Sequence, residues 1–416
     1  MRRLGGYTAL VGNRRFLVFW VGRTISSLGD AVFRIALLLM ATESSSSPLV
    51  LGAIVGSQTM VGIVLGPIAG VFADRHSRKQ LLVIGELLKL LPLLLLMSSF
   101  SVNSLIVAAV ITTIGGSVLA PARASLVPDL AGEAQYLAAA SLNELATSIV
   151  HLLGPLLSGL LTGKFGIKLV LAVIAGIRLL VLVTLALLGP LPAVVKRKDV
   201  QQTSFWLQLR AGLAAITHNR TIVMVVAVLL PVTIAVGALN VIQVDYVRNV
   251  LQVDAKQFGL VESLMAAGVL VTTFLLGLYG QRLNQAKLLF NSVILTGAVT
   301  SVFLLSPSLF FVYCWALLLG ASDGLLTLPF FSIIVSQTTA DIRGRVMSCF
   351  ESLLRVGVLF GLAVASVAAV HFGSAQILGC IGLAVLAAGL LVRLHPQYAI
   401  ITAERKEHVG AISDVG

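Results

Sequence analysis

Twelve long apolar stretches constrain this chain more strongly than any other feature. About 20 apolar residues suffice for one helix to cross the hydrocarbon core of a bilayer. Lipid offers no hydrogen-bond partner to the backbone, so each crossing must be helical. The sequence therefore predicts an all-α membrane protein of twelve transmembrane helices in two six-helix bundles. The expected spans are 16–41, 48–73, 80–100, 104–127, 137–162, 166–190, 220–243, 257–280, 288–305, 308–336, 345–370 and 374–394.

Composition leaves little room for another class of protein. The chain has 416 residues, of which 58% are hydrophobic, and 29 basic and 17 acidic residues make up only 11% of it. A soluble globular protein carries roughly 25% charged residues. The short connections between the twelve spans also exclude a separate soluble catalytic domain.

The basic residues are distributed unevenly between the two sides of the predicted membrane. When both termini are placed on one side, 19 basic residues lie there and 4 lie on the other side. Positive charge accumulates in cytoplasmic loops. We therefore expect both termini in the cytoplasm and a multi-pass protein of the inner (cytoplasmic) membrane. The net charge of +12 is explained by topology, so no nucleic-acid partner is indicated.

The longest connection divides the chain near its middle. Residues 191–219 contain the basic run Lys196–Lys198, followed by apolar residues at helical spacing. This pattern is typical of an amphipathic helix lying on the membrane face, although a lipid-recognition or calmodulin-like role is an alternative. The expected domains are thus 1–190, the linker 191–219 and 220–395, with a cytoplasmic tail at 396–416.

The two halves resemble each other when the sequence is shifted by about 207 residues. Parallel duplication of this kind implies a twofold axis along the membrane normal and a substrate cavity between the halves. The matching positions are Gly70 and Gly277, Pro121 and Pro329, and Glu144 and Glu351.

A compact charged motif follows the second span. It reads Gly70-Val-Phe-Ala-Asp74-Arg75-His-Ser-Arg78-Lys79. This resembles the cytoplasmic loop signature of the major facilitator superfamily, G-x-x-x-D-R-x-x-R-K. The resemblance implies a conformational latch on one face of a transporter, formed by these residues together with Asp129. Arg75 is the expected partner of Asp129.

Other segments narrow the resemblance to the macrolide-efflux and enterobactin-exporter branch of that superfamily. They are Ser26–Asp30, Ala120–Pro128 and the Gly154-Pro155…Gly159 pattern of span five. The resemblance implies proton-driven export of amphipathic drugs such as macrolides, with a siderophore or lysophospholipid as alternative cargo. The sequence departs from the family pattern in two places. Gln281 replaces the acid of the motif in the second half. The family's arginine motif at the extracellular end of span four is absent, because Arg123 lies at the cytoplasmic end of that span.

Two carboxylates inside spans are candidates for proton coupling. A charge near mid-membrane costs at least ~2.5 kcal/mol, so such residues usually serve a function. Asp30 lies near the middle of span one, and Arg34, four residues on, is its expected partner. A structural ion pair and a coupling carboxylate both remain open for Asp30. Glu144 has no basic neighbour at helical spacing, and a glutamic acid protonated and bonded to another helix is its alternative.

Further polar residues inside spans are assigned to the cavity or to gating. Glu86 is expected to pair with Lys89 on its own helix, and Glu262 is expected to be solvated. Glu351 and Arg355 are gating candidates that could pair with each other. The candidates for the substrate cavity are Arg34, Asn143, Arg178 and Asp323.

Competing classes of function find little support. The sequence has no metal-binding histidine motif and no complete phosphate loop, so neither an enzyme nor a cofactor is indicated. A channel fits a duplicated chain with a latch less well than alternating access does. A non-transporting receptor remains an alternative. We expect a monomeric secondary transporter whose partners are protons, a small amphipathic substrate and the lipid bilayer.

Overall fold

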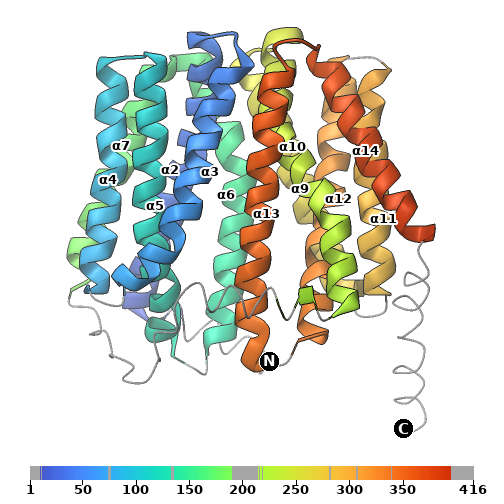
Figure 1. The fold of residues 1–416 in the computed structure, drawn as a ribbon. Coiled ribbons are helices and arrows are strands. Elements are labelled where there is room, and N and C mark those ends of the chain that lie inside the picture. The colour runs from blue at the N-terminus through green and yellow to red at the C-terminus, as the bar shows by residue number, and fades with distance from the viewer. Residues whose placement is uncertain are drawn as a thin grey trace, which may run out of the picture. The chain divides into compact units, whose positions relative to one another are not determined.

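The structure is a computed structural model in which every regular element is a helix, over the residues it describes (Figure 1). The described residues are 10, 12–73, 76–132, 135–189, 214, 216–217, 219–280, 283–305, 308–338 and 340–394. The first six long helices are α2 (Arg14–Ser44), α3 (Pro48–Ala73), α4 (Arg78–Ser98), α5 (Val102–Ala131), α6 (Tyr136–Phe165) and α7 (Ile167–Leu187). The others are α9 (Arg220–Asp245), α10 (Ala255–Tyr279), α11 (Gln285–Ser301), α12 (Leu309–Ser336), α13 (Ala340–Ala368) and α14 (Ser374–Leu394).

All twelve helices are long and apolar enough to span a membrane, which confirms the predicted spans. Two ends are extended by short turns: a π-helical turn, η2 (Tyr246–Val250), follows α9, and a 3₁₀ turn, η4 (Val302–Leu304), follows α11. The amphipathic helix predicted in 191–219 and the tail at 396–416 lie almost wholly outside the described residues.

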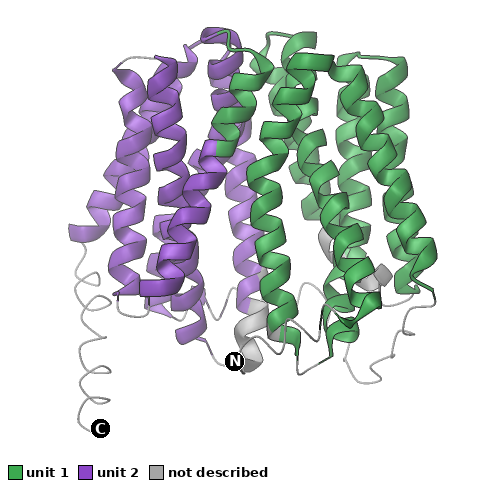
Figure 2. Cartoon of the chain, turned by 180° about the vertical axis from the view of Figure 1, so that it is seen from behind, with its two compact units in different colours: residues 1–200, 252–263 green, residues 201–251, 264–416 purple. Residues whose placement is uncertain are grey.

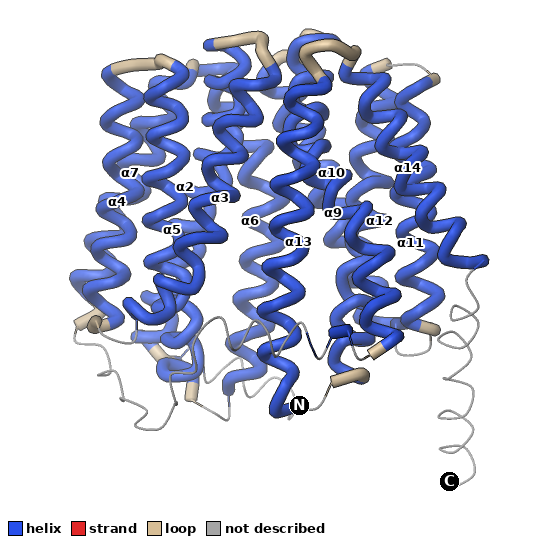
Figure 3. The backbone as a smooth tube through the Cα atoms, viewed as in Figure 1, coloured by secondary structure: helices blue, strands red, loops and turns tan. Residues whose placement is uncertain are grey.

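Polar residues at the helix starts satisfy backbone amides that have no partner within the helix. Asn13 accepts from the amide of Phe16 at the start of α2. Ser77 and Gln80 form a reciprocal capping box at the start of α4. Such caps contribute about 1 kcal/mol each. The loops lie at the ends of the helices (Figure 3).

The chain divides into two compact units, coloured in Figure 2. Unit 1 comprises residues 1–200 and 252–263, and therefore contains α2 to α7 and the start of α10. Unit 2 comprises residues 201–251 and 264–416, and contains α9, the rest of α10, and α11 to α14.

The helices repeat along the chain with the period that the sequence indicates. Four helices of the first half and four of the second begin 207 residues apart, which is strong evidence for duplication. These pairs of first residues are Pro48 and Ala255, Arg78 and Gln285, Val102 and Leu309, and Ile167 and Ser374.

Each unit has its own apolar core. In unit 1, Phe16, Phe19 and Leu82 belong to a buried cluster that also draws on α5 and α7. In unit 2, Phe330 stacks on Phe350 with ring centroids 4.5 Å apart. Many other large apolar side chains are exposed, as expected for a surface that faces lipid.

Candidate functional site

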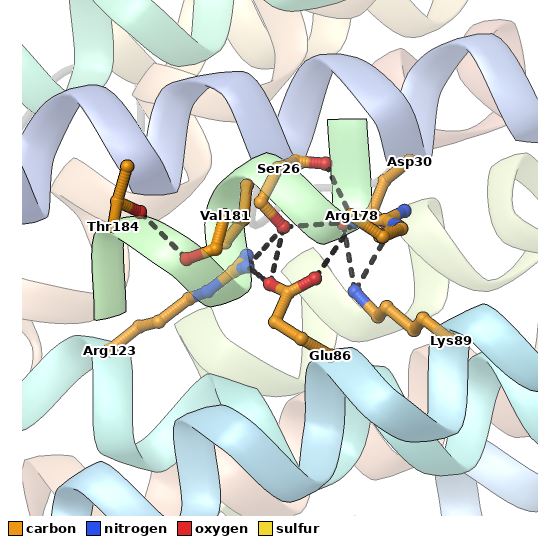
Figure 4. Close-up of polar contacts among 8 residues, drawn as sticks. All are labelled: Ser26, Asp30, Glu86, Lys89, Arg123, Arg178, Val181 and Thr184. Carbon is orange, nitrogen blue, oxygen red and sulfur yellow. Dashed lines mark hydrogen bonds and ion pairs between the residues drawn. The ribbon is translucent and has the colours of Figure 1, made fainter. Parts of the chain in front are cut away.

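Charged side chains from four helices meet inside unit 1. We call Ser26, Asp30, Glu86, Lys89, Arg123 and Arg178 the charge network (Figure 4). They come from α2, α4, α5 and α7. Three of them carry positive charge and two carry negative charge. The network thus joins four helices through ion pairs inside the apolar bundle.

Asp30 is held by two basic residues from different helices. Lys89 Nζ of α4 donates to both carboxylate oxygens at 2.8 and 2.9 Å. Arg178 of α7 donates to Oδ1 at 2.5 Å. The Asp30 side chain is 32% exposed, whereas those of Lys89 and Arg178 are 5% and 1% exposed. Asp30 is therefore the carboxylate of the network that solvent can reach.

Glu86 occupies the buried end of the network. Its Oε1 accepts from Arg123 at 2.7 Å and from the Ser26 hydroxyl at 2.6 Å. Its Oε2 accepts from Arg178 at 3.2 Å. Each of its oxygens is thus bonded to a guanidinium group, which compensates the buried charge.

The partners within this network differ from those predicted along single helices. Asp30 pairs with Lys89 and Arg178 and not with Arg34, and Glu86 does not pair with Lys89. These predictions were wrong because ion pairs between helices take the place of pairs along one helix. Arg178, which the sequence assigns to the substrate cavity, meets the carboxylates of Asp30 and Glu86 on two other helices.

Arg34 lies one turn beyond Asp30 and pairs elsewhere. Its guanidinium donates to Glu262 of α10 at 3.1 Å. The Arg34 side chain is 50% exposed and that of Glu262 is 9% exposed. The expectation of a solvated Glu262 was therefore wrong.

Asn143 and Glu144 of α6 have different surroundings. Asn143 is buried and lines a small pocket with Arg23, Thr24 and Thr147. Glu144 is exposed and interacts electrostatically with Arg23, yet it makes no hydrogen bond or ion pair with another residue that the structure describes. Glu144 thus has a basic neighbour on α2, although it has none on its own helix.

Unit 2 has no counterpart of the charge network at the repeat-equivalent positions. The residues 207 positions after Glu86, Arg123 and Arg178 are apolar and belong to the buried core of unit 2. A threonine stands 207 positions after Lys89, and it bonds to the hydroxyl of Ser322 at 3.0 Å. Val293 corresponds to Glu86, Phe330 to Arg123, Val385 to Arg178 and Thr296 to Lys89.

The three predicted site residues of unit 2 stand apart from any ion pair among the described residues. Asp323 of α12 is exposed, as are Glu351 and Arg355 of α13. The possible ion pair between Glu351 and Arg355 is not formed, and their gating role stays a prediction.

The motif after α3 is partly described. Arg78 forms an ion pair with Asp129 at the end of α5. The sequence analysis expected Arg75 to be the partner of Asp129. Lys79 donates to the carbonyl oxygens of Ala186 and Gly189 at the end of α7. Gly70 lies within α3, whereas Asp74 and Arg75 lie outside the described residues.

Sequence reasoning missed two members of the site. Arg123 was assigned to the cytoplasmic end of its span, yet it bonds to Glu86 within the bundle. Arg23 lies within the first predicted span and received no role from the sequence, although it lines two small pockets. Their presence inside apolar stretches was the only signal available, since intramembrane charges are rare.

Comparisons with known proteins agree with this architecture. The family model of the Major Facilitator Superfamily matches residues 19–242 and 225–413. Macrolide efflux protein A of Streptococcus pyogenes is 24% identical over 376 residues, which cover 86% of this chain and 90% of that protein. Multidrug resistance protein MdtG of Salmonella paratyphi C is 27% identical over 322 residues, which cover 74% of this chain and 76% of that protein.

Solved structures share the fold at low sequence identity. The nucleoside transporter NupG superposes with a TM-score of 0.72 at 11% identity, covering 94% of this chain and 99% of that one. A bacterial homologue of the iron transporter ferroportin, in an inward-facing state, superposes with a TM-score of 0.68 at 18% identity. The superposition covers 94% of this chain and 99% of that one. Because the family model matches nearly the whole chain, this protein belongs to the major facilitator superfamily and is a membrane transporter of small molecules, not an enzyme.

Proposed function

We propose that this transporter exports small amphipathic molecules, macrolides among them, in exchange for protons by alternating access. The efflux proteins among its relatives support the choice of cargo. Asp30 is the proposed proton carrier, and the charge network is the proposed coupling element. Glu144 is the second candidate carrier because it is exposed and makes no ion pair among the described residues.

The observation that carries this proposal is the contrast between the two repeats. The equivalents of Glu86, Arg123 and Arg178 are apolar core residues of unit 2. A duplicated bundle can therefore be built without buried charges at these positions. Buried ion pairs are also weak sources of stability, because desolvation offsets most of their attraction. The charges of unit 1 are therefore better explained by transport than by folding.

The geometry of Asp30 supports a coupling mechanism. Its carboxylate holds Lys89 of α4 and Arg178 of α7 against α2. Protonation of Asp30 would remove the negative charge that binds Lys89 and one of the two that bind Arg178. The ties of α2 to α4 and α7 would then weaken, which would favour a second arrangement of these helices. Loss of the proton on the other side of the membrane would restore the ties.

The proposal also covers the location of the protein, its latch and its cavity residues. We place the protein in the cytoplasmic membrane as a monomer with both termini in the cytoplasm, which reporter fusions to the carboxyl end can test. The ion pair of Arg78 with Asp129 is the proposed latch, together with Lys79, Gly70, Asp74 and Arg75. Asn143 and Asp323 remain proposed cavity residues.

Flux in proteoliposomes tests the proposal. An imposed pH gradient should drive transport of at least one member of a panel of macrolides and other amphipathic drugs. Asp30→Asn should abolish the dependence on the gradient, because the amide cannot exchange a proton. Glu144→Gln, which removes the other candidate carboxylate, should retain it.

The outcomes separate the candidate carriers. If Glu144→Gln loses gradient dependence and Asp30→Asn keeps it, Glu144 is the carrier and the mechanism drawn from Asp30 is wrong. If the gradient drives no flux of any compound through the wild-type protein, proton-coupled efflux is wrong.

A further inference from the structure

Arg178 is shared between the two carboxylates of the charge network (Figure 4). Its Nη2 donates to Asp30 Oδ1 at 2.5 Å, and its Nη1 donates to Glu86 Oε2 at 3.2 Å. The Asp30 side chain is 32% exposed, whereas that of Glu86 is 1% exposed. Arg178 thus lies between a carboxylate that solvent can reach and one that it cannot reach.

Ser26 holds the Nη1 end of this guanidinium in place. Its hydroxyl oxygen accepts from Arg178 Nη1 at 2.9 Å, and its backbone carbonyl oxygen accepts from the same nitrogen at 3.1 Å. The hydroxyl group also accepts from Arg123 at 2.6 Å and donates to Glu86 Oε1 at 2.6 Å. A hydroxyl group has one hydrogen and two lone pairs, and Ser26, which is fully buried, uses all three.

Arg178 and Glu86 could bond more strongly than they do. Arg178 Nε is a buried donor with no acceptor among the described residues, and such donors are costly and therefore rare in folded proteins. Within the described part of the chain, Glu86 Oε2 accepts only the Nη1 bond. Guanidinium and carboxylate groups pair most strongly through two parallel bonds. The guanidinium is therefore divided between two carboxylates and fully paired with neither.

Basic groups from three helices act on Asp30. Lys89 of α4 and Arg178 of α7 bond to it, and the charge of Arg123 of α5 also acts on it. A proton on Asp30 would remove the only carboxylate that Lys89 contacts among the described residues, whereas Arg178 would keep Glu86.

The other helices that pack against α2 direct their ionisable groups elsewhere. α6 packs against α2 and carries two such groups away from its ends. Glu144 interacts with Arg23. His151 interacts with Arg34. α3 has no ionisable residue. The state of Asp30 is therefore felt chiefly within the charge network.

We propose that Ser26 is a positioning residue of the coupling site, which holds Arg178 so that its guanidinium passes from Asp30 to Glu86 when Asp30 takes up a proton. A neutral Asp30 no longer attracts Nη2, whereas Glu86 keeps its charge in the core. Ser26 keeps Nη1 beside Glu86, so a rotation of the guanidinium about that end is sufficient. The inference rests on the proposed function, in which Asp30 is the proton carrier.

The shift determines which helices are released. α7 remains tied to α2 through the bonds of Arg178 to Ser26, and it remains tied to α4 through Glu86. Lys89 of α4 loses its partner on α2. Protonation therefore separates α4 from α2 at the end of the network that solvent reaches, while the buried end stays closed.

A structure of Asp30→Asn, determined by electron cryomicroscopy in lipid nanodiscs, tests the shift without any measurement of transport. The amide imitates the protonated carboxyl group. Compared with the wild type at the same pH, Arg178 should form two bonds with Glu86 and keep its bonds to Ser26. Asp30→Ala gives the same expectation and cannot itself accept a bond from Arg178. If Arg178 bonds to Glu86 through Nη1 alone in both variants, the shift is wrong.

Gradient-driven flux measured against pH tests Ser26. Ser26→Ala removes one bond from Arg178 and one from Glu86, so Arg178 should favour Glu86 before Asp30 is protonated and compete less with protons for Asp30. The pH of half-maximal flux should rise by about half a unit to one unit, the equivalent of one neutral hydrogen bond. Ser26→Cys, which keeps the size of the side chain but accepts hydrogen bonds weakly, should move the midpoint in the same direction.

Ser27→Ala is the matched control for these variants. Ser27 is the next residue on α2, is partly buried, and makes no side-chain hydrogen bond to another described residue, so its variant should keep the midpoint of the wild type. A lower flux at every pH with an unchanged midpoint in both Ser26 variants would reduce Ser26 to a structural role and overturn the proposal. If the wild type shows no gradient-driven flux, the proposed function fails, and the structure of Asp30→Asn still decides whether Arg178 moves while held by Ser26.

Discussion

Glu86 illustrates how much a single buried charge matters in this bundle. It is 1% exposed and is bonded to two guanidinium groups. Glu86→Gln keeps the volume but leaves Arg123 and Arg178 short of one negative charge. Removing one partner of a buried ion pair costs about 3–5 kcal/mol, so we expect a clearly lower midpoint of thermal unfolding in detergent.

A surface variant provides the comparison for Glu86. Arg393 is exposed and donates to Asn291, so Arg393→Gln should change the free energy of unfolding by less than about 1 kcal/mol. Equal midpoints for the two variants would contradict the structural weight given to Glu86.

At the scale of single residues, the sequence identified the charged residues but not their partners. Arg34 and Glu262 are 228 positions apart, and no spacing rule connects them. Spacing predicts contacts only along one helix, whereas the partners of Asp30 and Glu86 depend on how each helix is rotated against its neighbours. Arg178 was identified as a charge inside a span, but the sequence could not say which carboxylates it would meet.

At the scale of the element, hydropathy was sufficient to locate the twelve long helices among the described residues, but not every one of their ends. The largest shift at a helix start is at α13, which begins at Ala340, five residues before the predicted 345. Its first residues include Asp341, Arg343 and Arg345, and a hydropathy criterion does not extend a span into such a segment. The π-helical turn after α9 was missed because no propensity rule signals it.

Two glycines of α10 show how close approach between helices can be tested. A Cβ atom on Gly268 would collide with the backbone of α12 at Leu317 and Ala321, whereas a Cβ on Gly277 would meet nothing within 4 Å. Gly268→Ala should therefore destabilise unit 2 by about 1–3 kcal/mol through overpacking. Gly277→Ala should be neutral or stabilising by up to about 1 kcal/mol.

Thermal unfolding of the two glycine variants in the same detergent checks this prediction. Both substitutions are chemically identical and lie on one helix, so a difference in midpoint reports the approach of α12. Equal midpoints would mean that α10 and α12 do not cross as closely as the structure indicates.

At the scale of the whole molecule, duplication was predictable and its divergence was not. Matching motifs indicated the 207-residue repeat, and the helix starts follow it. The replacement of charged by apolar residues became visible only when helices could be paired: Phe330 stands where Arg123 does in the first repeat, and Val293 where Glu86 does. A shared backbone therefore does not imply a shared interior.

This divergence predicts the result of making the interior of unit 1 resemble that of unit 2. The variant combines Glu86→Val, Lys89→Thr, Arg123→Phe and Arg178→Val with Asp30→Ala, so that no network charge remains unpartnered. Replacing whole buried ion-pair groups by apolar residues is often neutral or stabilising by about 1–4 kcal/mol. We therefore expect a folded protein whose unfolding midpoint is near that of the wild type, and markedly above that of Glu86→Gln.

The same variant should lose gradient-dependent flux, because no ionisable group of the network is left to couple protons to helix movement. Unfolding in detergent and flux in proteoliposomes must be measured on the same preparation. A folded variant without coupling would separate the function of the charges from their part in folding. A variant that cannot fold would mean that unit 1 needs its charges for stability, and the contrast between the repeats would no longer support a transport role. Retained coupling would place the proton pathway outside the network, with Glu144 the next residue to replace.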